Sequence, residues 1–188
     1  MVVETEQQLL DAIRSGERSA LRRLYERYVG YAMAIGLRYI PQRDQVEDVV
    51  QDSFVKIITS IGDFRYKGEG SLSSWVSRIV ANMAIDYVRK NERVSFVSTV
   101  PDAPEEPPER DDDGPPIERI PPGALAEMIA KLPPGYRLVL NLHVFEQCTH
   151  KEIAQRLGIK EKSSASQLSR ARVLLTEMME NYIKKNKI

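Results

Sequence analysis

The fold is decided by residues 44–93, which read DQVEDVVQDSFVKIITSIGDFRYKGEGSLSSWVSRIVANMAIDYVRKNER. In the first part of this stretch, apolar residues recur at steps of three and four from Val46 to Ile61, which is the spacing of one side of an α-helix. Asp44, with Glu47 three residues later, matches an N-cap that satisfies the free amides of a first turn. We therefore predict a helix that begins at Asp44 and turns its apolar side toward a core.

The opposite side of this helix is acidic over its first two turns. It carries Glu47, Asp48, Gln51 and Asp52, and negative side chains near a helix N-terminus are favourable. Two interpretations stay open at this point, a solvated face and a surface that binds a partner.

A second helix is predicted from about Ser71 to Arg93, because apolar residues cover more than half of its circumference. They are Leu72, Trp75, Val76, Ile79, Val80, Met83, Ala84 and Val88. The polar residues form a narrow stripe, namely Ser74, Arg78, Asn82, Asp86, then Arg89 or Lys90, and Arg93. Arginine and amide side chains contact phosphate oxygens and base edges, although an ordinary exposed helix face has the same composition.

The loop between these helices combines two glycines with alternating aromatic and basic residues, Phe64, Arg65, Tyr66 and Lys67. Aromatic rings beside cations suit the unstacked bases of a single strand. The alternative interpretation is a glycine-rich turn in which Phe64 belongs to the core.

The whole stretch resembles region 2 of the bacterial extracytoplasmic-function (ECF) sigma factors over roughly fifty residues in register. The resemblance is carried by EDVVQDSF at 47–54, the loop at Phe64, WVSRIVAN at 75–82 and DYVR at 86–89.

The charge of the chain is divided unevenly along its length. Its 188 residues include 27 basic and 27 acidic ones, so the formal net charge is zero. Residues 1–94 hold 14 basic and 13 acidic side chains, residues 95–123 hold 2 and 8, and residues 124–188 hold 11 and 6, which gives +1, −6 and +5. We predict a domain at 1–94, a linker at 95–123 and a basic domain at 124–188.

Two further helices are predicted upstream, from Thr5 to about Ser15 and from Glu17 or Ser19 to about Ile40, where Pro41 ends the second one. They complete a four-helix N-terminal domain. The linker holds eight of the eleven prolines and the acidic run DDD at 111–113. Proline denies amide donors to helices and sheets, so we predict a flexible acidic linker.

The C-terminal domain begins with two short predicted helices, from about Ala124 to Leu132 and from Pro134 to Phe145. Thr149 and Glu152 then form a capping-box pattern, a helix of barely two turns follows, and Gly158 is placed to end it in a left-handed conformation. A final helix is predicted from about Glu161 or Lys162 to Lys184. These last two helices have the pattern of a helix-turn-helix motif.

The second helix of such a motif enters a major groove with its first turns. The candidate contacts there are Ser163, Ser164, Ser166, Gln167, Arg170 and Arg172, since serine, glutamine and arginine reach bases and phosphates. The alternative is a helix-turn-helix that serves only for packing.

Residues 132–172 resemble region 4 of the same sigma factors, without gaps from Thr149 to Arg172. Ser164 and Ala165 depart from the family pattern, which usually has a branched apolar residue and a basic one at these positions. The large central region of housekeeping sigma factors is absent, which favours the ECF class, group 4. The resemblance implies an all-α fold with two small helical domains joined by the acidic, proline-rich linker.

The resemblance also implies a function. The protein is expected to be a transcription initiation factor that binds core RNA polymerase through Asp48, Gln51 and Asp52 and makes it promoter-specific. The minus-ten element of promoter DNA would be read and opened by Phe64, Arg65, Tyr66, Lys67, Ser74, Arg78, Asn82 and Arg89. The minus-thirty-five element would be read as a duplex by the six candidates on the last helix. The linker would thread toward the RNA exit path, and an anti-sigma factor is a common partner in the family.

Two alternatives remain beside this expectation. One is a conventional regulator that binds an operator through the helix-turn-helix, and the other is a decoy that binds polymerase without reading a promoter. An enzyme is not expected, because the sequence shows no phosphate loop and no nucleophile paired with a base.

Cys148 is the only cysteine, so no internal disulfide can form, which fits a reducing compartment. His143, Cys148 and His150 raise the question of a metal site, but their spacing matches no closed zinc pattern. We expect no metal or cofactor. The N-terminus lacks an apolar signal core, and the uncharged run from Tyr28 to Leu37 is too short to cross a bilayer. The expected location is the cytoplasm, without membrane insertion.

Overall fold

The computed structural model describes residues 4–91 and 117–186. Within these ranges the chain forms eight α-helices and two short 3-10 helices and has no strand, which confirms the predicted all-α class. The chain divides into two compact units, Met1–Tyr87 and Val88–Ile188. None of the described helices combines the length and apolar composition needed to cross a membrane.

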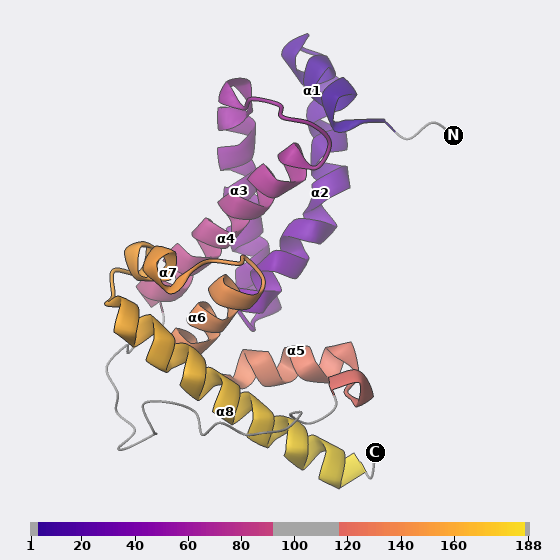
Figure 1. Ribbon diagram of the computed structural model, residues 1–188. Helices are drawn as coiled ribbons and strands as arrows, with labels where there is room; N and C mark the ends of the chain where they lie inside the picture. The colour runs from indigo at the N-terminus through magenta and orange to yellow at the C-terminus, as the bar shows by residue number, and fades with distance from the viewer. Residues whose placement is uncertain (1–3, 92–116, 187–188) are drawn as a thin grey trace. The chain divides into compact units, whose positions relative to one another are not determined.

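The N-terminal unit is built from α1 (Glu6–Arg14), α2 (Arg18–Tyr39), α3 (Arg43–Ser60), η1 (Ile61–Asp63) and most of α4 (Ser71–Asn91). α1 packs on α2, and α2 packs on α3. Figure 1 shows α1 across one end of α2, beside the loop that leads into α4. Large side chains in this core that are fully buried include Leu9, Leu10, Leu24, Ile35, Tyr39, Ile40, Ile57 and Leu72.

The packing of α2 on α3 depends on a glycine at their contact. A Cβ atom at Gly36 would lie 2.5 Å from Cγ1 of Val46, so no larger residue fits without movement of α3. Tyr25 and Leu37 are apolar residues of α2 that are 42% and 38% exposed. Tyr25 packs its ring against Phe54 at the edge of the core, with 4.7 Å between the ring centroids.

The start of α3 differs from the prediction. Gln42 occupies the N-cap position without a side-chain hydrogen bond, and the helix begins at Arg43. The amide of Val46 already donates to the carbonyl of Gln42, so Asp44 lies inside the first turn. Glu47 does not close a capping box and pairs with Arg43 one turn earlier, at 3.1 Å. The prediction of Asp44 as N-cap was therefore wrong.

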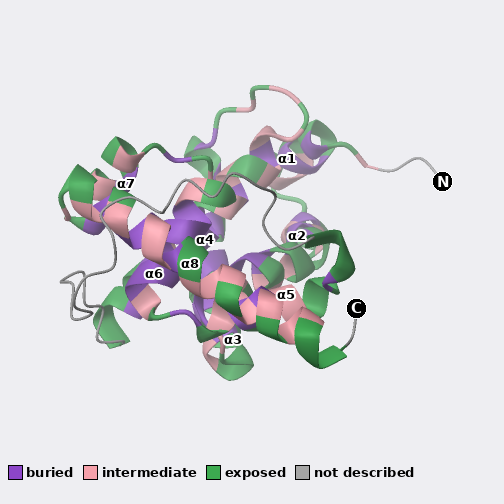
Figure 2. Cartoon of the chain, turned by 60° about the horizontal axis from the view of Figure 1, so that its bottom comes forward, coloured by how far each residue is buried: buried purple, intermediate pink, exposed green. Residues whose placement is uncertain are grey.

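The C-terminal unit contains η2 (Ile117–Arg119), α5 (Pro122–Lys131), α6 (Pro134–Val144), α7 (His150–Leu157) and α8 (Glu161–Asn186). α6 is buried on nearly all sides, from Gly135 to Leu142, as its colouring in Figure 2 shows. It packs on α7 and α8, and α8 also packs on α5 and α7.

The C-terminal end of the predicted linker includes residues that form part of the C-terminal unit. Residues 117–119 form η2, and Ile120 is 5% exposed in a small apolar cluster with Met128 and Met179. The C-terminal unit therefore begins before the predicted residue 124, because the apolar side chain of Ile120 gains a buried contact there. The rest of the linker, 95–116 with its acidic run, lies outside the described residues.

The helix-turn-helix pattern is confirmed in α7 and α8. The hydroxyl of Thr149 accepts the amide of Glu152 at 3.3 Å, and the Glu152 carboxylate accepts the amide of Thr149 at 2.8 Å. Gly158 ends α7 with φ 67° and ψ 35°, the left-handed conformation that glycine adopts without strain. Ile153 and Leu157 of α7 and Leu168 of α8 are buried, and Ala154 and Ile159 are half-buried.

Candidate nucleic-acid and partner interfaces

One side of α4 is fully buried and the other is exposed and polar. Leu72, Val76, Val80 and Ala84 succeed one another at steps of four, and each is 0% exposed. The polar stripe predicted from the sequence occupies the exposed side, where Ser74, Arg78, Asn82, Asp86 and Arg89 all lie. Arg93 lies outside the described residues. Because the buried row fixes the rotation of the helix, the guanidinium and amide groups of the stripe face outward along several turns.

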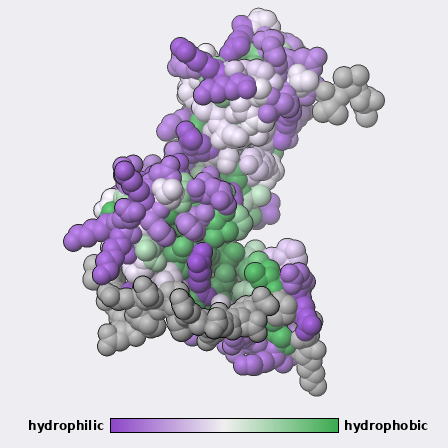
Figure 3. All heavy atoms as spheres, viewed as in Figure 1, coloured by the Kyte–Doolittle hydropathy of each residue, from purple (hydrophilic) through white to green (hydrophobic). Residues whose placement is uncertain are grey.

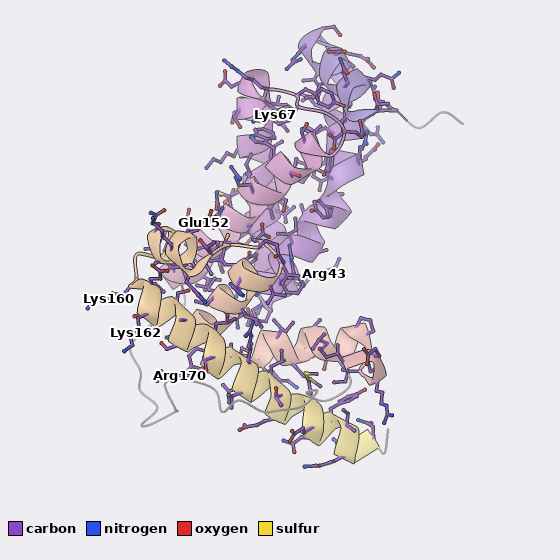
Figure 4. All side chains as sticks on the ribbon, viewed as in Figure 1. Arg43, Lys67, Glu152, Lys160, Lys162 and Arg170 are labelled. Carbon is purple, nitrogen blue, oxygen red and sulfur yellow. The ribbon has the colours of Figure 1, made fainter. Side chains whose placement is uncertain are left out.

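The loop before α4 adds two cations at the start of this stripe. Arg65 and Lys67 are exposed and Tyr66 is half-buried. The Tyr66 hydroxyl donates to the Glu69 carboxylate at 3.2 Å. Gly68 and Gly70 have φ of 119° and 87°, values that other residues rarely adopt. Figure 4 shows Lys67 on this loop, between α3 and the start of α4.

Phe64, predicted as a base-stacking residue, is largely buried in the free chain. Its side chain is only 9% exposed, and its ring packs on Trp75 with 5.0 Å between centroids. Its carbonyl accepts a hydrogen bond from Arg14 Nη2 at 2.9 Å. This burial favours the alternative interpretation, a core phenylalanine beside a glycine-rich turn, because burying its apolar ring is favourable. The contact of Phe64 with DNA stays a prediction.

The acidic surface predicted on α3 is exposed. Asp48, Gln51 and Asp52 point away from the core, since the buried row of the same helix contains Val46, Val49, Val50 and Phe54.

Apolar residues continue the acidic surface toward the end of α3. Val55 is 63% exposed and Ile58 is 38% exposed, and they follow Gln51 at steps of four and three. Sequence reasoning placed Ile58 in the core and overlooked Val55. A surface that joins carboxylates with exposed apolar side chains is suited to a protein partner.

Two of the predicted contacts on α8 are buried. Ser164 is 0% exposed and Gln167 is 2% exposed. The hydroxyl of Ser164 lies 3.0 Å from Nδ1 of His150 on α7, while Gln167 Oε1 finds no hydrogen-bond partner in the described part of the chain. Ser164 lies one turn before the core residue Leu168, and Gln167 is its neighbour. Both face the core of the C-terminal unit, which argues against the predicted contact of Ser164 and Gln167 with DNA, and that contact stays a prediction.

The outer face of α8 is formed by a different set of residues. Lys162, Ala165 and Arg172 are exposed, and Ser169 between them is half-buried. They recur at steps of three and four, as residues on one side of a helix do. The predicted contacts Ser163, Ser166 and Arg170 flank this face and are half-buried.

Sequence reasoning missed Lys162 and Ser169, and also Lys160 just before the helix. The spacing from Leu168 alone could not have revealed this face, because Ala165 and Arg172 lie three positions before and four positions after Leu168 and are nevertheless exposed. Figure 4 shows Lys160, Lys162 and Arg170 along one edge of α8. In Figure 3 the atoms over α7 and the start of α8 are mainly hydrophilic on the face shown.

The two histidines of the C-terminal unit form a stacked pair. The rings of His143 and His150 are 5.0 Å apart with an angle of 4° between their planes. Burial lowers the pKa of His150, and the neighbouring His143 and Arg172 lower it further, against an opposing effect of Glu161. His143 Nδ1 lies 3.1 Å from the backbone carbonyl of Cys148. No group of three potential metal ligands occurs among the described residues.

Two family models match this chain. The Sigma-70 region 2 model matches residues 24–94, and the Sigma-70, region 4 model matches residues 123–175. Together they span well over half of the chain, and their order agrees with the α4 surface in the first unit and the helix-turn-helix in the second.

Curated relatives match over almost the whole chain. An ECF RNA polymerase sigma-E factor of Haemophilus influenzae is 28% identical over 95% of this chain and 95% of its own length. One from Escherichia coli K12 is 25% identical over 96% of this chain and 97% of its own. The solved structure of CnrH in complex with the cytosolic domain of CnrY covers 95% of this chain and 99% of that chain, with 25% identity and a TM-score of 0.48.

The protein belongs to the sigma-70 family of transcription initiation factors. Within that family it is an ECF-type sigma factor, which binds RNA polymerase and directs promoter-specific initiation.

Proposed function

We propose that this ECF sigma factor belongs to group 4 and that its two units recognise two different forms of promoter DNA. Residues 1–94 would bind core polymerase and open the minus-ten element, and residues 124–188, together with η2 and Ile120, would bind the minus-thirty-five element. The match to a sigma-E relative over 95% of each chain supports the absence of a large central region.

The minus-ten surface is proposed on α4 and the loop before it. The observation that carries this proposal is the exposed stripe of Ser74, Arg78, Asn82 and Arg89, opposite a fully buried row on the same helix. Arg65 and Lys67 add positive charge at its start, where they can hold the phosphates of a strand. Separating the strands costs a few kcal/mol, which contacts to the released bases must offset. With Phe64 buried, Tyr66 is the loop ring that remains available for such contacts.

The minus-thirty-five surface is proposed on the outer face of α8. Ser163, Ser166, Arg170 and Arg172 are kept from the sequence prediction, because each retains some exposure. Lys162 and Ser169 are added, since they lie on the same face. A helix with short polar side chains and cations at its first turns can enter a major groove and contact both bases and phosphates.

The polymerase-binding surface is proposed on α3, with Asp48, Gln51 and Asp52 as its charged part and Val55 as its apolar part. All four are exposed. Charges at the rim set the rate and specificity of association, while apolar contacts supply much of the affinity.

Regulation by an anti-sigma factor and a location in the cytoplasm are proposed from membership of the ECF class. The location in the cytoplasm agrees with the proposed function, because the factor must reach core polymerase.

The test combines two steps. Transcript starts are first mapped after overexpression, which identifies a promoter. Purified protein and core polymerase are then used for transcription in vitro from that promoter. We expect promoter-specific transcripts with the wild type and their loss when Arg78→Ala is combined with Asn82→Ala.

A matched control removes one guanidinium group and one carboxamide group elsewhere, in the double variant Arg22→Ala with Gln42→Ala. Both of these residues are exposed. This control is expected to retain activity. Core binding without transcripts would favour a decoy, and tight binding to a palindromic duplex without polymerase would favour an operator-binding regulator.

A further inference from the structure

The first turn of α4 is capped by a residue from α1. The first four amides of an α-helix have no partner inside the helix. In α4, the amides of Ser71 and Ser74 donate to carbonyls of the preceding loop. The amides of Leu72 and Ser73 donate to the carboxylate of Glu6, at 2.9 and 3.0 Å. The two amides that have no partner in the preceding loop thus donate to Glu6, which lies 66 positions before Leu72 and 67 positions before Ser73.

Local sequence offers no cap for this helix. The residue before α4 is Gly70, which has no side chain that could accept an amide. The Glu6 carboxylate fills this position, is 2% exposed, and accepts a third hydrogen bond from the Tyr28 hydroxyl at 2.9 Å.

Glu6 is ionised at neutral pH. Burial raises the pKa of its carboxyl, but the hydrogen bonds from Leu72, Tyr28, Ser73 and Gly70 together outweigh burial and leave the pKa below its ordinary value of 4.5. A carboxylate at the N-terminus of a helix is further favoured by the helix dipole.

The other end of α1 holds the beginning of the same loop. Arg14, in the last turn of α1, donates from Nη2 to the carbonyl of Phe64 at 2.9 Å. The amide of Glu6 faces both carboxylate oxygens of Glu69 at 3.3 Å, and Glu69 in turn accepts the Tyr66 hydroxyl. α1 therefore contacts the loop at its beginning, near its end and at the helix that follows, as the adjacency of α1 and the loop in Figure 1 illustrates.

These attachments act on a segment that would be flexible without them. Two glycines in left-handed conformations give the loop many alternative backbone states, and ordering each residue costs free energy. A binding loop that is ordered in advance does not lose that free energy when it engages its target.

We propose that α1 is a clamp that holds residues 64–74 in the conformation used to open a promoter, with Glu6 and Arg14 as its positioning residues. This inference rests on the proposed role of the loop at the minus-ten element. Neither residue is required to touch DNA, since both act through backbone groups of the loop and of α4.

The first experiment measures amide hydrogen exchange in the free full-length protein, without DNA or polymerase. In Glu6→Gln we expect the amides of residues 64–74 to exchange about tenfold faster or more, as follows from losing hydrogen bonds to a charged group. Exchange in α2 and α3 should remain as in the wild type. Glu26→Gln is the control, because its exposed carboxylate pairs with Arg22 on the surface. Unchanged exchange in residues 64–74 of Glu6→Gln would overturn the clamp.

The second experiment compares two templates in transcription with core polymerase. One is the mapped promoter as a duplex, and the other is the same promoter with its minus-ten segment already unpaired. Glu6→Gln is expected to slow open-complex formation on the duplex by about tenfold or more, as a displaced binding group does, and to leave the unpaired template unaffected. Equal losses on both templates, or no loss on either, would overturn the proposal.

Arg14→Gln and Tyr28→Phe keep the test decisive if Glu6→Gln does not fold. The side chain of Arg14 is 47% exposed, so its loss leaves the core intact while it releases the start of the loop. Both variants are expected to shift the same two readouts in the same direction. If the double variant Arg65→Ala with Lys67→Ala opens the duplex like the wild type, the proposed DNA role of the loop fails. The hydrogen-exchange experiment still decides in that case whether α1 positions the loop.

Discussion

The rings of Phe64 and Trp75 pack against each other across the loop that precedes α4, with centroids 5.0 Å apart and planes at 42°. This contact joins the first residue of the loop to the first turns of α4. The exposed side of α4 carries the proposed minus-ten surface. It also assigns Phe64 to the core.

We predict that Phe64→Ala lowers the free energy of unfolding of the N-terminal unit by about 3 kcal/mol, the size expected for a truncated buried aromatic residue. Tyr66→Ala is the comparison and should cost less than about 1 kcal/mol, since it loses one exposed hydrogen bond. Denaturation in urea can be followed through Trp75, the only tryptophan. If Phe64→Ala retains full stability yet fails to open a promoter, the ring contacts DNA after all.

The double variant Asp48→Lys with Asp52→Lys should abolish co-purification with core polymerase while its melting temperature stays near that of the wild type. Both carboxylates are exposed, so reversing them disturbs the proposed partner surface and leaves the core intact. Asp11→Lys with Glu26→Lys changes the net charge equally on other exposed sites and should still bind. Polymerase binding that survives the first double variant would remove this assignment.

Lys162→Ala and Arg172→Ala should each weaken binding of holoenzyme to promoters of different sequence by a similar factor. If each side chain contacts one phosphate, each loss should reduce the slope of log affinity against log salt by about 1. Electrophoretic or fluorescence titrations at several salt concentrations provide the measurement. Glu177→Ala, an exposed change farther along α8, serves as control, and slopes that do not change would place the groove-facing side elsewhere.

Gln167→Leu is expected to stabilise the C-terminal unit by about 1 kcal/mol, because a buried amide oxygen that has no partner among the described residues carries a desolvation cost that leucine avoids. Promoter recognition should be retained. Chemical denaturation and transcription in vitro check the two halves of this prediction. A stable variant that no longer recognises its promoter would restore the sequence-based assignment of Gln167 as a DNA contact.

Acidification should destabilise the C-terminal unit through His150. Burial, and then the charge of His143, lower the pKa of this imidazole below 6.5 in the folded chain. When the pKa of a histidine is lower in the folded chain than in the unfolded chain, its neutral ring stabilises the fold at pH values above the unfolded pKa. This stabilisation is lost as the pH falls below about 6.5 and passes through the folded pKa.

A titration of the His150 ring followed by NMR should give a midpoint below 6.5. His143→Phe removes the neighbouring charge and should raise the midpoint only in part, since burial remains the larger effect. A midpoint above 6.5 in the wild type would contradict the prediction.

Features that depend on residues close in sequence were predicted well. The capping box of Thr149 and Glu152 and the left-handed Gly158 involve groups within a few positions of one another, and both are present. The periodic apolar rows likewise predicted the helices, with bounds that differ by a few residues at most. Asp44 is an exception, because an ion pair between Arg43 and Glu47 accompanies a start one residue earlier.

Which polar residues are exposed was less predictable. Ser164 and Gln167 have the chemistry of DNA contacts, but their position relative to Leu168 places them in the core. Phe64 has the chemistry of a stacking residue, and its contact with Trp75 buries it. In each case residue type suggested one role, and the neighbours in space assigned another.

Periodicity and capping arise within a few helical turns, so they were enough to predict the all-α class, the division into two helical modules, the helix-turn-helix and the polar stripe of α4. The cap that Glu6 of α1 provides for α4, and the extension of the acidic surface by Val55, depend on how the helices pack. These hydrogen bonds join residues more than sixty positions apart, and the exposure of a side chain depends on which residues pack against it. Neither feature leaves a local pattern in the sequence.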